Sequence, residues 1–258
     1  AQSRVIEETF MRMGLPYTMV GGLKFYDRKE IKDILAYLRV IYNPLDSISM
    51  MRIINVPKRG LGATSLVHLT NFAAENNASI FDIIANPEML NAVPSLTARA
   101  KKTMQEFAAF LIMKMGKASS LHIDQLIEEV LEDSGYFKEL EVDKKPESQT
   151  RIENLKEFIG VARDFEKQEG QEATLENFLA QLSLVSDIDN AELADDRVTM
   201  MTLHAAKGLE FPCVFLVGME EGIFPNQRTL LDPEEIEEER RTCYVGITRA
   251  ERKLYLSY

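Results

Sequence analysis

The sequence predicts an α/β fold in which a large, all-helical block interrupts a parallel-sheet domain. Strand-like segments occur only near the two ends of the 258-residue chain, and the residues between them have helical periodicity. Neither end supplies enough strands to close a core alone, so we expect the two ends to form one domain. The helical block of ~165 residues would then be an insertion into that domain.

The N-terminal segment predicts a helix followed by a strand. Val5, Ile6, Phe10 and Met13 lie on one helical stripe, and Gly14 follows as a C-cap. Leu15–Val20 then predicts a short strand that ends at two glycines.

A longer helix is expected to begin at Asp27. Asp27 and Glu30 have the spacing of a capping box, and apolar residues recur at helical intervals until Asn43-Pro44. From Asn55 to about Ser186, further helices are predicted by their starting residues, which are Thr64, Ser79 with Asp82, Ser95, His122 and Thr174.

The pattern changes after this block. Asp187–Asp196 is acidic and predicts a linker, and Val198–Leu203 is rich in strand-forming residues. Cys213–Val217 is continuously apolar, which predicts a strand buried on both faces. Asp232-Pro233 then begins a helix that should run to about Tyr244, and Leu254–Leu256 predicts a last strand.

Composition and charge exclude several classes of protein. No apolar run approaches the ~20 residues of a membrane span. Cys213 and Cys243 make neither a disulfide framework nor a zinc motif, so we expect a cytoplasmic protein with no metal site of its own. The net charge of −11 argues against a generally basic nucleic-acid-binding surface. However, Lys24–Gly62 has eight basic and four acidic residues, which permits a local phosphate-binding face.

Two C-terminal segments carry side chains suited to phosphate chemistry. The loop Thr202–Phe211 follows one predicted strand and precedes another, and it contains His204, Lys207 and Glu210. Arg249 follows the predicted helix and could stabilise the charge of a transferring phosphoryl group. The alternatives are ordinary surface charges in the loop and salt bridges along the helix, as Arg240 and Arg241 permit. Arg249 has no acid four residues before it.

The helical block contains one candidate phosphate-binding turn. Pro57–Thr64 places Gly60 and Gly62 around Leu61 just before a predicted helix, and Lys58 and Arg59 add positive charge. Backbone amides in such a turn can hold a phosphate, but a simple helix–helix connector has the same pattern. No G-x-x-x-x-G-K-[ST] motif occurs in the sequence, so the chain could contact a nucleotide without cradling its phosphates.

These segments together resemble the UvrD/Rep/PcrA group of superfamily-one DNA helicases. Val198–Phe211 is similar to motif V, Glu237–Ala250 to motif VI, and Ala1–Arg4 to the end of motif IV. The resemblance covers essentially the whole chain and is weakest from about Asn86 to Asp195. It implies a RecA-like motor domain (2A), incomplete here, at 1–24 and 192–258, and an all-helical inserted domain (2B) at 25–191.

The resemblance also implies residue roles. Arg249 matches an arginine finger for ATP, and Glu210 matches a carboxylate near the nucleotide sugar. His204 and Lys207 match positions that contact single-stranded DNA or couple it to hydrolysis, and Asn226 stands where relatives carry a His near the DNA strand. The residues of the turn match a grip on duplex DNA: Lys58, Arg59, Gly60, Leu61, Gly62 and Thr64.

The implied function is the C-terminal motor half of an ATP-dependent 3′→5′ DNA helicase that acts on single-stranded and duplex or junction DNA. ATP with Mg²⁺ would be held mainly by a missing N-terminal motor domain, so the fragment alone should bind no cofactor and be inactive. We expect a monomer with no membrane association. The motor half of a helicase–nuclease subunit and an acidic helical protein-interaction module remain alternatives.

Overall fold

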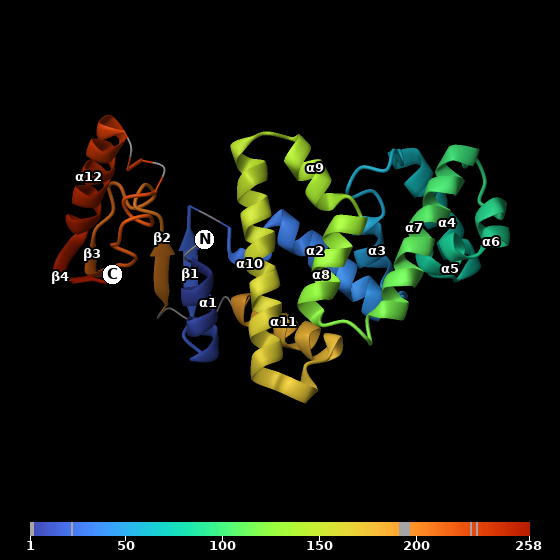
Figure 1. The fold of residues 1–258 in the computed structure, drawn as a ribbon, viewed down its shortest axis with the longest axis horizontal. Helices are drawn as coiled ribbons and strands as arrows, with labels where there is room; N and C mark the ends of the chain where they lie inside the picture. The colour runs from blue at the N-terminus through green and yellow to red at the C-terminus, as the bar shows by residue number, and fades with distance from the viewer. Residues whose placement is uncertain (1–2, 22, 191–196, 228, 231) are drawn as a thin grey trace. The chain divides into compact units, whose positions relative to one another are not determined.

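The structure, a computed structural model, describes residues 3–21, 23–190, 197–227, 229–230 and 232–258 (Figure 1). The described residues form two compact units. One unit is helical and covers Tyr26–Asp187, and the other combines the residues before and after it. The fold is therefore mixed α/β and mostly helical, as predicted.

The α/β unit joins segments from both ends of the chain. β1 and β2 pair in parallel, with Tyr17 opposite Val198, and β3 and β4 form a second parallel pair. The pairing of β1 with β2 thus brings together segments from the two ends of the chain. The elements are α1 (Ser3–Arg12), β1 (Tyr17–Val20), β2 (Val198–Met201), β3 (Phe211–Leu216), α12 (Pro233–Ile247) and β4 (Ala250–Leu256).

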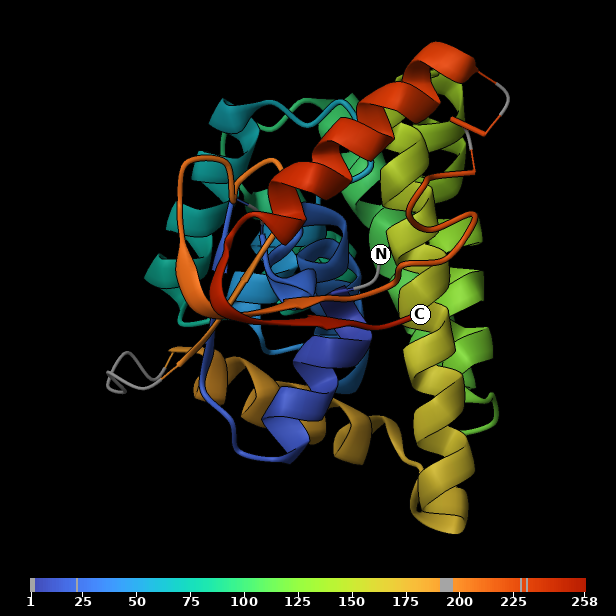
Figure 2. The ribbon, with the colours of Figure 1, turned by 90° about the vertical axis from the view of Figure 1, so that its left-hand side faces the viewer.

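Helix α12 packs beside the β3–β4 pair (Figure 2). Asp232 caps its first turn through the amide of Glu234, and Pro233 is the first helical residue, as predicted. The expected burial of the third strand on both faces is wrong. The ring centroids of Phe215 and Tyr255 lie 4.5 Å apart, and Phe215 is 66% exposed. The next residue, Leu216, is buried and faces α12, because a Cβ built on Gly246 would lie 3.1 Å from one of its methyl groups.

The helical unit is built around α2. Both α8 and α10 lie alongside it, and α3 and α7 also contact it (Figure 1). Its apolar residues Ile31, Ile34 and Leu38 are completely buried. The elements are η1 (Phe25–Asp27), α2 (Lys29–Tyr42), α3 (Ser47–Ile53), α4 (Ala63–Asn76), α5 (Ile80–Ala85), α6 (Pro87–Ala92), α7 (Ala98–Lys117), α8 (Ile123–Asp133), α9 (Tyr136–Val142), α10 (Pro146–Glu169), η2 (Gly170–Glu172) and α11 (Leu175–Asn190).

The predicted capping box at the start of α2 is wrong. The helix begins at Lys29, and its N-cap, Arg28, makes no side-chain cap. Glu30 is instead buried and accepts a 2.6 Å hydrogen bond from Asn154 on α10. By contrast, the capping box of Ser79 and Asp82 on α5 is confirmed.

The predicted acidic linker is only partly described. Asp187–Asn190 form the end of α11 rather than a linker, and residues 191–196 lie outside the described residues. Within the described ranges, every helix is too short or too polar to cross a membrane.

Candidate functional site

The side chain of Asn55 makes three hydrogen bonds to the main chain of the turn before α4. Its Oδ1 accepts hydrogen bonds from the amides of Arg59 at 2.8 Å and Leu61 at 3.3 Å, and its Nδ2 donates to the Leu61 carbonyl at 2.8 Å. Gly60 has φ +75°, a conformation that favours glycine, and Leu61 is only 4% exposed. The turn therefore has one fixed shape, with Leu61 anchored in the core.

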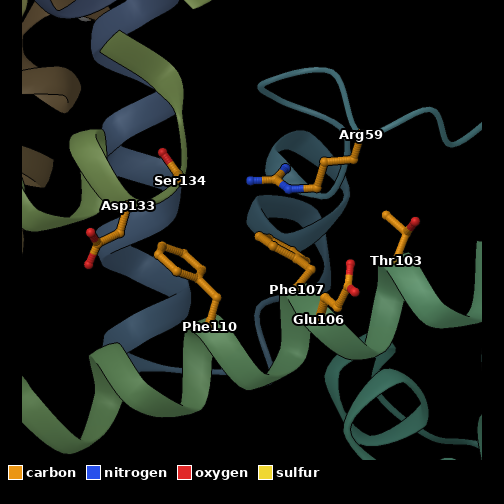
Figure 3. A pocket seen from close by; sticks show the side chains of 7 residues that line it. All are labelled: Arg59, Thr103, Glu106, Phe107, Phe110, Asp133 and Ser134. Atoms are coloured by element: carbon orange, nitrogen blue, oxygen red, sulfur yellow. The ribbon is translucent and has the colours of Figure 1, made fainter. Parts of the chain in front are cut away.

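The guanidinium group of Arg59 points into the helical unit. Its Nη2 donates to the Tyr37 hydroxyl at 2.6 Å, and its Nη1 donates to the Ile53 carbonyl at 2.9 Å. The guanidinium lies 4.2 Å from the ring centroid of Phe107, toward which Figure 3 shows it pointing. Burial raises the pKa of Tyr37, so its hydroxyl stays neutral and donates in turn to the Val56 carbonyl. Arg59 thus ties the turn to α2 and α7.

Two cavities flank Arg59. The first cavity has a volume of about 350 Å³ (Figure 3). Besides Arg59, it is lined by four residues of α7 and two at the end of α8, which are Thr103, Glu106, Phe107, Phe110, Asp133 and Ser134. The other, of similar volume, lies on the side of Lys58, Lys138 and Glu139. Glu139 accepts a 2.8 Å hydrogen bond from the Lys58 amide, and the Lys58 side chain is exposed.

The start of α4 completes the turn. The helix begins at Ala63, one residue before the predicted Thr64, and its N-cap is Gly62. Gly62 has no side chain to cap the first turn of α4, and both Gly62 and Thr64 are exposed. Uncapped amides at a helix start suit an anion, because they lack partners within the helix.

The loop between β2 and β3 presents charged groups to solvent. His204, Lys207 and Glu210 are all exposed, whereas Ala206 is buried. The loop is shaped by turns in which the Thr202 hydroxyl accepts from the Ala205 amide at 3.2 Å and the Thr202 carbonyl accepts from the Ala206 amide at 3.1 Å.

Arg249 joins this loop to the end of α12. Its Nη1 donates to the Leu209 carbonyl at 2.8 Å, and its Nε donates to the Val245 carbonyl at 3.0 Å. Its Nη2 donates to the Thr248 hydroxyl at 3.0 Å. These acceptors are neutral, and Arg249 meets no carboxylate within the described part of the chain. The fold therefore brings Arg249 to the residue that precedes Glu210.

The neighbouring arginines behave differently. Arg240 and Arg241 form ion pairs with Glu237 at 2.7 Å and Glu238 at 2.8 Å along α12. The salt-bridge interpretation of these two residues is thus confirmed. It does not extend to Arg249.

Asn226 lies in the loop between β3 and α12. It is exposed, and its carbonyl accepts from the amide and hydroxyl of Thr229, at 2.9 and 2.8 Å. The sequence did not single out Asn55 or Tyr37, although both shape the turn. An Asn shortly before a glycine turn was the only available signal, because Asn often bonds nearby backbone. Nothing local marks Tyr37, which lies on α2.

Comparison with known proteins gives a consistent result. The family described as "UvrD-like helicase C-terminal domain" matches residues 1–258. The chain is 49% identical to the ATP-dependent DNA helicase PcrA of Bacillus subtilis, 51% to that of Staphylococcus epidermidis and 50% to that of Staphylococcus aureus. Each match covers 100% of this chain and 35% of the relative, so the chain spans about a third of their length.

Proposed function

Because the chain belongs to the UvrD-like helicase C-terminal domain family, we propose that it is the C-terminal motor half of an ATP-dependent 3′→5′ DNA helicase. In this proposal, 1–24 and 192–258 form the second RecA-like motor domain, and 25–191 form the inserted helical domain. The division of the described residues into two compact units supports this assignment. A preceding motor domain would hold ATP and Mg²⁺, since this sequence has no Walker-A motif.

The observation that carries the proposal is the setting of Arg249. Its guanidinium keeps an uncompensated positive charge, because its described partners are two carbonyls and one hydroxyl. Such a cation can exchange neutral acceptors for a γ-phosphate when a nucleotide-bearing domain closes on it. Arg249 would then act as an arginine finger, and Glu210 would lie near the nucleotide sugar.

DNA contacts would come from two surfaces. On the α/β unit, the exposed His204 and Lys207 would contact single-stranded DNA, and the Asn226 amide could donate a hydrogen bond to the strand. Closing and reopening of the nucleotide cleft would alternate the grip on this strand, which converts hydrolysis into translocation.

On the helical unit, the turn Gly60–Thr64 would hold a phosphate of duplex DNA. The exposed Lys58 would reach another phosphate, and Leu61 would anchor the turn from within. Arg59 would support the turn, because its guanidinium already donates to the Tyr37 hydroxyl and to main-chain carbonyls. Phosphate contacts carry no base identity, so this binding should be independent of DNA sequence.

The test of the motor assignment is Arg249→Ala in the helicase that contains this chain. DNA-stimulated ATP hydrolysis should fall by at least ~10²-fold, since arginine fingers contribute ~10³–10⁵ to the rate. Affinity for single-stranded DNA should stay within about twofold. Arg252→Ala, which removes an exposed arginine from β4, is the matched control and should leave hydrolysis unchanged. Near-normal turnover of Arg249→Ala would refute the role of Arg249.

A further inference from the structure

We propose that Thr248 is a positioning residue for Arg249, and that its hydroxyl sets the direction of the guanidinium toward the nucleotide. This inference rests on the proposed role of Arg249 as an arginine finger. Thr248 is the C-cap of α12, and Arg249 follows it directly. The Thr248 hydroxyl accepts from Nη2 of Arg249 at 3.0 Å and donates to the Val245 carbonyl at 3.0 Å. The hydroxyl therefore links the guanidinium to the last turn of α12.

The main chain of Arg249 is fixed on both sides. Its amide donates to the Gly246 carbonyl at 3.1 Å, and its carbonyl accepts from the Phe211 amide at 2.9 Å, where β3 begins. The main chain thus places Arg249 between α12 and β3, and the side-chain torsions alone decide where its guanidinium points. A long side chain loses rotamer freedom when it is held in one direction, so that direction needs fixed partners.

Thr248 supplies the only side-chain acceptor that Arg249 meets among the described residues. The other two acceptors are main-chain carbonyls, of Leu209 for Nη1 and of Val245 for Nε. A guanidinium has five N–H groups, so two of them, one on each Nη atom, have no acceptor in the described part of the chain. These two N–H groups are available to a phosphate, and the Thr248 hydroxyl fixes the direction of the nitrogen that carries one of them.

A fixed direction matters for the rate of hydrolysis. A donor stabilises developing charge most effectively when it already points at the place where the charge appears. Without the Thr248 hydroxyl, the guanidinium would keep its positive charge but would have to reorient in each catalytic cycle. The loss should appear in kcat rather than in KM for ATP, because the contact to the phosphoryl group strengthens in the transition state.

The experiment measures DNA-stimulated ATP hydrolysis by a full-length protein that contains this chain. Thr248→Val keeps the size and branching of the side chain but removes both hydrogen bonds of the hydroxyl. We expect kcat to fall about tenfold, as for loss of a hydrogen bond to a charged group, with KM within about twofold. Thr248→Ser retains the hydroxyl and should keep most of kcat. Thr9→Val is the matched control in the same unit, because the Thr9 hydroxyl donates to the Val5 carbonyl at 2.7 Å in α1, and it should leave kcat unchanged.

Two further measurements separate positioning from a general loss of structure. ADP with aluminium fluoride mimics the transferring phosphoryl group, and Thr248→Val should weaken its binding about tenfold while ADP alone binds as before. In an Arg249→Ala background, Thr248→Val should cause no further loss of turnover, because Thr248 acts through the guanidinium.

A loss of kcat that Thr248→Ser avoids, and that disappears in the Arg249→Ala background, supports the inference. Normal kcat of Thr248→Val beside a severe loss in Arg249→Ala overturns the role of Thr248 and leaves the finger assignment standing. Normal turnover of Arg249→Ala overturns the finger assignment, and the inference with it. Equal losses from Thr248→Val in both backgrounds, or weaker binding of ADP alone, would show a structural effect and would also overturn the inference.

Discussion

Replacing Asn55 by Ala should loosen the turn before α4 more than any other single polar substitution in that segment. The Asn55 side chain makes three hydrogen bonds, to the amides of Arg59 and Leu61 and to the carbonyl of Leu61. A hydrogen bond contributes about 1 kcal/mol net, so their loss should cost about 3 kcal/mol. Water can replace them only partly, because Leu61 is 4% exposed.

Asn55→Asp should have an intermediate effect. Its carboxylate can still accept from the two amides, but it cannot donate to the Leu61 carbonyl and would repel that oxygen. We therefore expect a loss of about 1–2 kcal/mol, above the value for one missing hydrogen bond. The same variants should also weaken duplex binding, since the turn would no longer be held in one shape.

The assay is urea unfolding of the chain, followed by helical circular dichroism. Asn76→Ala is the matched control, because Asn76 donates a single exposed hydrogen bond to the Phe72 carbonyl at 2.8 Å. That control should lose at most about 1 kcal/mol. If Asn55→Ala costs no more than Asn76→Ala, the three hydrogen bonds do not hold the turn, and the reasoning fails.

Two predictions concern packing and pH in the same unfolding assay. Gly246→Ala should lower the free energy of unfolding by about 1–3 kcal/mol, because the new Cβ would lie 2.6 Å from a methyl of Leu203. The control Gly160→Ala has open space around the new Cβ and should be neutral or stabilising. Equal stabilities of the two variants would contradict this prediction. The hydrogen bond from the Lys114 ammonium lowers the pKa of Glu129 in the folded protein. The stabilisation from this pair is therefore complete above the unfolded-state pKa of ~4.3, and it is lost as the pH falls through the lower folded-state pKa. Glu129→Gln should therefore flatten the decline of stability below about pH 4.5, and an unchanged pH profile would refute this assignment.

Local signals predicted much of the secondary structure. The capping box of Ser79 with Asp82 and the Asp232-Pro233 helix start are interactions within one turn, so short sequence windows contain them. The Asp27–Glu30 pattern failed because Glu30 bonds Asn154, which is 124 positions away. The exposure of Phe215 was missed because an apolar strand does not reveal what covers its second face.

The candidate site shows the same limit. The glycine turn and the charged loop could be found from spacing, because each lies within about ten residues. The inward direction of Arg59 depends on Tyr37 and Phe107. No short window contains these partners, so the sequence alone predicts where the turn lies but not that Arg59 points into the protein.

As the proposed C-terminal motor half of an ATP-dependent helicase, this chain should depend on a second motor domain for ATP hydrolysis. Steady-state ATP hydrolysis tests this directly when it is measured for the purified 258-residue chain and for a full-length protein that contains it, each with Mg²⁺ and saturating single-stranded DNA. We expect no turnover above background from the chain, because its sequence has no Walker-A motif to cradle the phosphates, and rapid turnover from the full-length protein. Robust, DNA-stimulated hydrolysis by the chain alone would show that it is not the half of the motor that lacks the phosphate site.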